Sequence, residues 1–159
     1  MLKLRNARRA IAMVFAALAL AGSAIIATSG TANASWRDGE MFNYHKQQCL
    51  DGGGGWLSTW SCNGSSVQIW RDISSTVYYQ LQDSAGQCID SGQTSGLGSC
   101  NGGNYQLWSV SNIGTVNGRV YDQFRNVHYP NLCLDGGSNL GMPDAGPCNQ
   151  GDWQWFSWN

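Results

Sequence analysis

Apolar and polar residues alternate over short stretches in most of the chain beyond residue 35, and glycine-rich turns separate these stretches. Residues 77–82 and 115–120 have the two-residue period typical of a half-buried strand. Glycine runs at residues 52–55 and 136–137 are typical of loops. No long stretch has the 3.6-residue period of an amphipathic helix, so the pattern predicts an all-β domain.

The N-terminal segment departs from this pattern. Basic residues crowd the first nine positions, and an apolar run follows over residues 11–21, with apolar character as far as residue 27. A small-x-small motif stands at residues 32–34. This order predicts a secretory signal peptide over residues 1–34 and a secreted, extracellular domain over residues 35–159. An uncleaved membrane anchor is the alternative, because the apolar run is nearly long enough to span a bilayer, but the cleavage motif favours removal.

One sequence unit occurs three times in the predicted domain: Cys-x-Asp, then Cys-Asn, then Gln-x-(Trp/Phe). In every copy the glutamine falls six residues after the second cysteine, and the gaps between cysteines differ by only a few residues. A single copy is too small to bury its own apolar face, so three copies are expected to pack together. The predicted subdomains cover about residues 35–74, 75–112 and 113–159, and their first cysteines are Cys49, Cys88 and Cys133.

Six cysteines in an exported domain predict disulfides. Equivalent copies should pair equivalently, which selects one of the fifteen possible pairings. Each bond closes a short loop, which stabilises the fold by about 2–3 kcal/mol in the chain-entropy model. A metal site is disfavoured, because zinc sites use closely spaced Cys and His pairs, whereas His45 and His128 lie outside the cysteine pairs. The predicted disulfides are Cys49–Cys62, Cys88–Cys100 and Cys133–Cys148.

Other positions of the unit are predicted to build the scaffold. The terminal aromatic residue should enter a shared apolar core. The glutamine two residues earlier should be buried and hydrogen-bonded to the backbone, because a buried amide needs partners. The residue between cysteine and aspartate should be a core strand position. In chain order these sets are Trp70, Trp108 and Phe156; Gln68, Gln106 and Gln154; and Leu50, Ile89 and Leu134.

The net charge and the absence of catalytic motifs exclude several classes of function. Without residues 1–34, five Lys and Arg remain against ten Asp and Glu, a net charge of about −5. Phosphate binding needs clustered Lys and Arg, so nucleic acid and, after cleavage of the signal, membranes are not expected as partners. The chain lacks a phosphate loop and a Gly-x-Ser-x-Gly motif. A glycosidase needs two carboxylates within about 5–10 Å, but the repeated aspartates belong to different subdomains. We therefore expect neither an enzyme nor a cofactor.

The three Cys-x-Asp and Gln-x-Trp units resemble the ricin B-type lectin family, which is also carbohydrate-binding module family 13. The resemblance covers residues 35–159. It implies a β-trefoil, with three subdomains around a pseudo-threefold axis, six strands that close a barrel and six that form a cap. It also implies a non-catalytic sugar-binding protein with one shallow pocket in each subdomain, for galactosides or plant cell-wall sugars such as arabinan and xylan.

The family's pocket implies a role for each matching residue. The aspartate accepts hydrogen bonds from sugar hydroxyls, an aromatic residue two before the second cysteine stacks on the ring, and an asparagine and the adjoining glutamine complete the site. The first copy matches at Asp51, Trp60 and Gln68, but Val67 replaces the asparagine. Trp56 is a weaker candidate for an exposed platform.

The other two copies keep less of the pocket. Asp90 and Asp135 are weaker candidates, because the stacking position is glycine in both copies. Each repeated aspartate has a plain alternative role, which is to bond the nearby backbone of a turn. Trp60 could equally be core, and four tyrosines are interpreted as packing residues. The remaining positions are Gly98 and Gly146 for stacking, Tyr105 and Trp153 for the asparagine, and Tyr44, Tyr78, Tyr79 and Tyr129 for packing.

Two further hypotheses stay open. Trefoils also serve as protease inhibitors and as binding subunits of secreted toxins, so a protein partner is the main alternative to a carbohydrate. The damaged pockets favour that alternative. The loss of the asparagine in all three copies also suits a purely structural secreted protein without a ligand.

Overall fold

The computed structural model describes residues 38–137 and 144–159, which belong to one compact unit. The predicted signal peptide at residues 1–34 lies outside the described residues. Within the described part of the chain, no helix has the length and apolar character that a membrane crossing requires.

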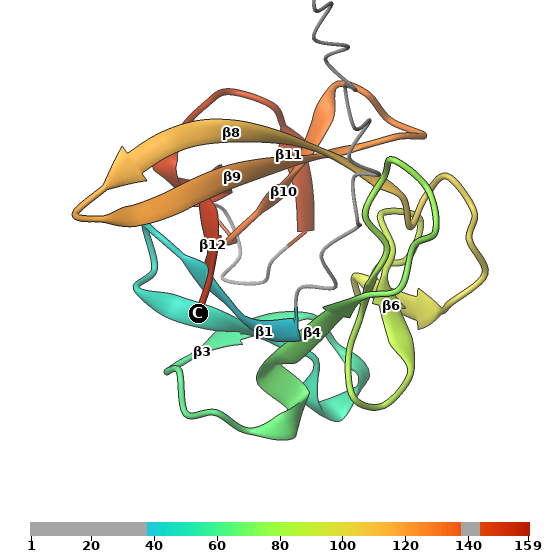
Figure 1. The fold of residues 1–159 in the computed structure, drawn as a ribbon. Helices are drawn as coiled ribbons and strands as arrows, with labels where there is room; N and C mark the ends of the chain where they lie inside the picture. Colours follow the sequence, from blue (N-terminus) through green and yellow to red (C-terminus); the bar gives the residue numbers. More distant parts are fainter. Residues whose placement is uncertain (1–37, 138–143) are drawn as a thin grey trace, which may run out of the picture. The chain divides into compact units, whose positions relative to one another are not determined.

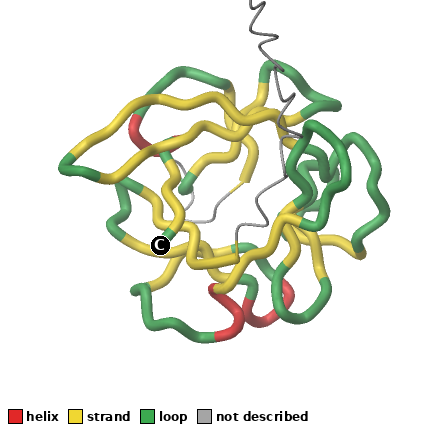
Figure 2. Tube along the Cα trace, viewed as in Figure 1, coloured by secondary structure: helices red, strands yellow, loops and turns green. Residues whose placement is uncertain are grey.

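Twelve short antiparallel strands and three single-turn 3-10 helices make up the described fold. Figure 2 shows strands and connecting loops, with helical turns as brief interruptions. The prediction of an all-β domain is confirmed. The strands are β1 (Asp38–Asn43), β2 (Gln48–Asp51), β3 (Ser58–Trp60), β4 (Ile69–Asp72), β5 (Leu81–Gln82), β6 (Gln87–Ile89), β7 (Leu97–Ser99), β8 (Trp108–Val116), β9 (Arg119–Asn126), β10 (Leu132–Asp135), β11 (Asp144–Pro147) and β12 (Phe156–Trp158). The helical turns are η1 (Gly53–Gly55), η2 (Ser66–Gln68) and η3 (Asp152–Gln154).

Six of these strands close a ring of pairings. β1 pairs with both β4 and β12, β4 pairs with β5, and β9 pairs with both β8 and β12. A bridge between Tyr79 and Trp108 joins the start of the β5 segment to β8 and completes the ring. Figure 1 shows β8 and β9 as a long hairpin on one side of this barrel. Closure leaves no free barrel edge along these pairings.

The other six strands form three hairpins, one in each copy of the sequence unit. They are β2–β3, β6–β7 and β10–β11, and the first strand of each also pairs with a barrel strand. A disulfide joins the first strand of each hairpin to the segment after its second strand. The predicted pairings Cys49–Cys62, Cys88–Cys100 and Cys133–Cys148 are confirmed.

The repeated apolar positions meet in one core, as predicted. Trp70, Trp108 and Phe156 are buried together with the hairpin residues Leu50, Ile89 and Leu134. The indole of Trp70 donates to the Leu50 carbonyl at 3.0 Å, and the indole of Trp108 donates to the Ile89 carbonyl at 3.4 Å. The side chain of Phe156 has no N–H to make the corresponding bond, so in the third copy this side chain contributes packing alone.

Both strands predicted from simple alternation are only partly correct. Residues 115–120 span the turn of the β8–β9 hairpin, because Asn117 and Gly118 both have positive φ. Asn-Gly is the preferred pair for a two-residue hairpin turn, and this local signal outweighs the alternation around it. In residues 77–82, only Leu81 and Gln82 belong to a strand; Val77 and Tyr78 form a bend, and Tyr79 makes the isolated bridge to Trp108.

Candidate functional site

A buried glutamine holds the repeated aspartate in every copy. In the first copy, the Gln68 amide donates to Asp51 Oδ2 and to the Ser61 carbonyl, both at 3.1 Å. Its oxygen accepts from the backbone N–H of Asn63 at 3.0 Å. Gln106 and Gln154 repeat this arrangement with Asp90 and Asp135. The predicted burial and backbone bonding of the glutamines are confirmed.

Each aspartate also bonds its own turn. The second carboxylate oxygen accepts from the backbone N–H two residues later, which is Gly53 for Asp51, Gly92 for Asp90 and Gly137 for Asp135. The plain turn role is therefore present in all three copies. Exposure then separates them: Asp90 is 5% and Asp135 3% exposed, whereas Asp51 is partly exposed. Asp51 is the aspartate most open to a ligand.

Trp60 is a surface residue, not a core residue. Its residue exposure is 64%, and in register it lies opposite Cys49, at the end of β3. Gly98 and Gly146 occupy the same position in the other two copies, so a Cβ atom built on each shows where the Trp60 side chain leaves the backbone. A Cβ atom would lie 2.9 Å from Asp90 Oδ2 at Gly98, and 3.3 Å from Asp135 Oδ2 at Gly146. By the pseudo-threefold repeat, the Trp60 side chain leaves the backbone beside the Asp51 carboxylate.

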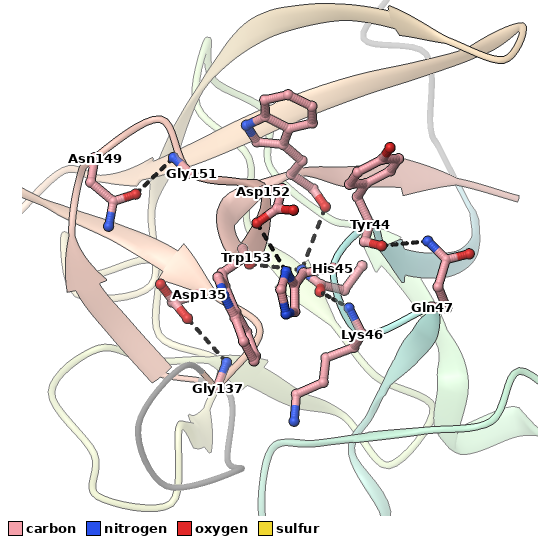
Figure 3. Close-up of polar contacts among 12 residues, drawn as sticks. Tyr44, His45, Lys46, Gln47, Asp135, Gly137, Asn149, Gly151, Asp152 and Trp153 are labelled. Atoms are coloured by element: carbon pink, nitrogen blue, oxygen red, sulfur yellow. Dashed lines mark hydrogen bonds and ion pairs between the residues drawn. The ribbon is translucent and has the colours of Figure 1, made fainter.

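The residues at the asparagine position are packed between copies. The Trp153 ring stacks on His45 of the first copy at a centroid distance of 3.7 Å, and Figure 3 shows the two rings together. His45 Nδ1 lies 3.0 Å from Asp152 Oδ1, and Lys46 Nζ lies 5.2 Å from the Trp153 ring centroid. These contacts link the third copy to the first.

The second copy makes an equivalent ring contact with a histidine of the next copy. The Tyr105 ring lies 3.9 Å from His128 of the third copy, measured between centroids. A Cβ atom at Gly92 would lie 3.1 Å from the Tyr105 ring, so backbone also covers that ring. A hydrogen bond with Tyr129 raises the pKa of the Tyr105 phenol above its usual value, and burial and the charge of Asp90 add to the rise.

A second set of repeated residues was not predicted. Asn43 and Asn126 are buried at the start of the turn that precedes the first cysteine of the first and third copies, and Asp83 holds that place in the second. The amide of Asn43 donates to the Trp153 carbonyl at 2.7 Å, and that of Asn126 to the Tyr105 carbonyl at 2.9 Å. The number of residues between each of these positions and the next cysteine differs between copies, so an alignment on the cysteines does not reveal this second repeat.

Asp83 cannot make the bond that its two counterparts make. One carboxylate oxygen accepts from the backbone N–H groups of Ala85 and Gln87 at 3.0 and 2.8 Å. The other, Oδ2, is buried and has no hydrogen-bond partner, a state it shares with only Trp158 Nε1 among the described residues.

The described residues bring Glu40 close to the sulfur atoms of Cys49 and Cys62. Both sulfurs are engaged in a disulfide, and Glu40 accepts the Gly64 backbone N–H at 2.7 Å. This group does not offer the thiolate ligands that a zinc ion would take.

No protein-family model and no curated protein matches this sequence. Solved structures do match. The designed threefold-symmetric protein ThreeFoil superposes with a TM-score of 0.64 at 20% identity, over 77% of this chain and 98% of that one. The chain is a β-trefoil. The fold expected from the resemblance to ricin B-type lectins is thereby confirmed.

Other trefoil matches have similar scores. The hemolytic lectin CEL-III gives a TM-score of 0.62 at 21% identity, over 77% of this chain and 32% of that chain. SeviL bound to asialo-GM1 saccharide gives 0.60 at 18% identity, over 76% and 94%. An exo-β-1,3-galactanase from Clostridium thermocellum gives 0.64 at 20% identity, but the trefoil spans only 30% of that chain.

Proposed function

We propose that this trefoil is a secreted, non-catalytic carbohydrate-binding protein whose first copy holds the sugar. The observation that carries the proposal is that an exposed Trp60 lies beside a partly exposed Asp51, whose carboxylate accepts a hydrogen bond from the buried Gln68 amide. Neither of the other copies has an aromatic residue at the stacking position, and their aspartates are buried.

The chemistry of a sugar suits this pair. A pyranose has a face of C–H groups, which packs on an indole ring, and a rim of hydroxyls, which donate to a carboxylate. Asp51 Oδ1 and Oδ2 already accept one bond each from Gly53 and Gln68. Each carboxylate oxygen has a second lone pair for a hydroxyl, and the two existing bonds hold the group in one orientation. Gln68 thus contributes by positioning Asp51.

The matched structures support the same class of ligand. CEL-III is a lectin, SeviL was solved with a saccharide, and the Clostridium thermocellum protein acts on a galactan. Galactosides and plant cell-wall polysaccharides are therefore the first ligands to test. The net charge of about −5 in residues 35–159 also favours a neutral ligand over a phosphate-rich one.

Replacement of Trp60 or Asp51 with alanine should weaken sugar binding at least about tenfold, because each removes one of the two contact types. A glycan array and pull-down on insoluble galactan, arabinan and xylan would identify the ligand, and titration calorimetry would give the affinities.

Tyr78→Ala serves as the control, since Tyr78 is an exposed aromatic residue in the loop between β4 and β5. It should bind like the wild type. Thermal unfolding of all variants would show that their folds are intact. If the wild type retains no glycan, or if both first-copy variants bind as well as the wild type, the proposed site is wrong.

A protein-binding trefoil is the second candidate. The burial of Asp90 and Asp135 favours it, because two of the three expected sugar pockets then lack both an aromatic plate and an open carboxylate. Purification of the native secreted protein with a stoichiometric protein partner, together with an empty glycan array, would favour this candidate over a lectin. The N-terminal sequence of the same material would test cleavage after Ala34.

A further inference from the structure

A second exposed tryptophan lies on the same outer face as Trp60. Along the segment that leads into β3, Leu57 and Thr59 are buried, whereas Trp56 and Trp60 are 51% and 64% exposed. Ser58, between them, is partly exposed. Trp56 has extended backbone angles, φ −129° and ψ 136°, so it continues the alternation of the strand. Trp56, Ser58 and Trp60 therefore point to one side, away from the core.

Asp51 lies between the two indoles along this face. It is the register partner of Ser58, and the Ser58 hydroxyl donates to the Asp51 carbonyl at 3.2 Å. At about 3.3 Å per residue, the four steps from Trp56 to Trp60 place their Cα atoms about 13 Å apart. This distance exceeds the width of one sugar ring. A single monosaccharide on Asp51 and Trp60 would leave the Trp56 ring uncovered.

Trp56 is anchored despite its exposure. The next residue, Leu57, is buried in the core, and its backbone N–H donates to the Ser95 carbonyl of the second copy at 2.8 Å. On the other side, Gly54 and Gly55 both have positive φ, at 76° and 78°, and the chain bends at Trp56 as it leaves this glycine turn and enters the segment before β3. A backbone held at Leu57 loses little entropy on binding, which favours an aromatic platform at Trp56.

We propose that the first copy binds an internal stretch of a neutral oligosaccharide chain, with Trp56 and Trp60 stacking on separate sugar units and Asp51 binding hydroxyls between them. This inference rests on the proposed sugar-binding function and extends it to the length and charge of the ligand. Residues 47–70 contain no Lys or Arg and a single acidic residue, Asp51. A neutral chain fits this surface, whereas uronic acid or sulfated chains would meet a carboxylate with no compensating cation from this segment.

The test compares ligand lengths. Calorimetric titrations would use xylose and xylohexaose, galactose and β-1,3-linked galactohexaose, and arabinose and α-1,5-linked arabinohexaose. The wild type should bind one hexasaccharide about tenfold or more tightly than its monosaccharide, because a second stacking contact forms. Trp56→Ala should remove most of that difference and leave monosaccharide affinity unchanged. Trp60→Ala should weaken both ligands, and Trp56→Phe should keep much of the length dependence.

The outcomes distinguish failure of the oligosaccharide site from failure of the proposed sugar-binding function. If the wild type binds a monosaccharide and its hexasaccharide equally, or if Trp56→Ala keeps the full difference, the two-platform site is wrong while the Asp51–Trp60 pocket stands. If none of the six sugars binds, the proposed function fails with it. Tyr78→Ala should retain both affinities, and a loss in that variant would also count against the site.

Discussion

Replacement of Gln106 with leucine should lower the free energy of unfolding by about 3–5 kcal/mol. The amide of Gln106 is fully buried and donates to Asp90 Oδ2 at 2.9 Å and to the Ser99 carbonyl at 2.8 Å. Its oxygen accepts from the Asn101 N–H at 2.8 Å and from the Gln80 amide at 3.0 Å. Leucine fills similar space but leaves all four partners without this side chain, and Asp90 is a buried charge.

Urea unfolding followed by tryptophan fluorescence would measure the change. Gln93→Leu is the matched control, because Gln93 is exposed and its hydrogen bonds to Asp90 and Gly96 use only backbone atoms. That substitution should alter stability by less than about 0.5 kcal/mol. A Gln106→Leu protein as stable as the wild type would contradict the role of the glutamine as the polar centre of its copy.

Replacement of Asp83 with asparagine should raise the free energy of unfolding by about 1–3 kcal/mol. Asp83 Oδ2 is buried without a partner, whereas the Asn43 amide nitrogen at the corresponding place donates to the Trp153 carbonyl. The surroundings match: a Cβ atom at Gly52 would lie 2.6 Å from Asp83 Oδ2, and one at Gly136 would lie 2.7 Å from Asn43 Nδ2. Asparagine would place a donor where Asp83 has an unpaired acceptor.

The carbonyl that would receive this bond is also identified by the repeat. The Trp153 carbonyl accepts from the Gly136 N–H, and the Val67 carbonyl accepts from the Gly52 N–H, each at 2.8 Å. Val67 is therefore the expected acceptor for an amide at residue 83. The preferred conformation of the turn should survive, because the oxygen that bonds Ala85 and Gln87 is retained.

The reverse substitution, Asn126→Asp, tests the same argument, and its expected effect on the free energy of unfolding is the opposite. It removes the amide that donates to the Tyr105 carbonyl and should lower stability by a similar amount. Both variants would be compared by urea unfolding at pH 7. Loss of stability in both would show that Asp83 is favoured by its own surroundings and would refute the repeat-based explanation.

Repetition made most of the scaffold predictable. The disulfide pairing follows from the equivalence of the three copies, and so do the burial of Gln68 and the shared core position of Trp70. The cysteines and the glutamines have equivalent partners in all three copies, and the terminal aromatic residue occupies the same core position in each. The alternation rule alone was weaker, since it missed the Asn117-Gly118 turn, where backbone conformation and not burial decides the structure.

Contacts between copies were not predictable in this way. His45 packs on Trp153 and His128 on Tyr105, although the partners belong to different copies and are far apart in the sequence. Ala85 stands two residues after Asp83, as His45 stands two after Asn43, and the residue that corresponds to Trp153 in the neighbouring first copy is Val67. This matched pair of sizes becomes visible only once the barrel places the copies side by side.

The sequence by itself determined the three-copy architecture, its disulfides and the residues of its core, because these depend on residue type and spacing that recur in each copy. The tertiary structure decided which of the repeated aspartates remains open and which aromatic residues face outward. Asp51, Asp90 and Asp135 share the same local motif, yet their exposure differs, because it depends on the loops and neighbouring copies that pack around them. Trp56 and Trp60 are exposed because the strand alternation places Leu57 and Thr59 on the opposite face, and the packing of the core against that face leaves both indoles outside.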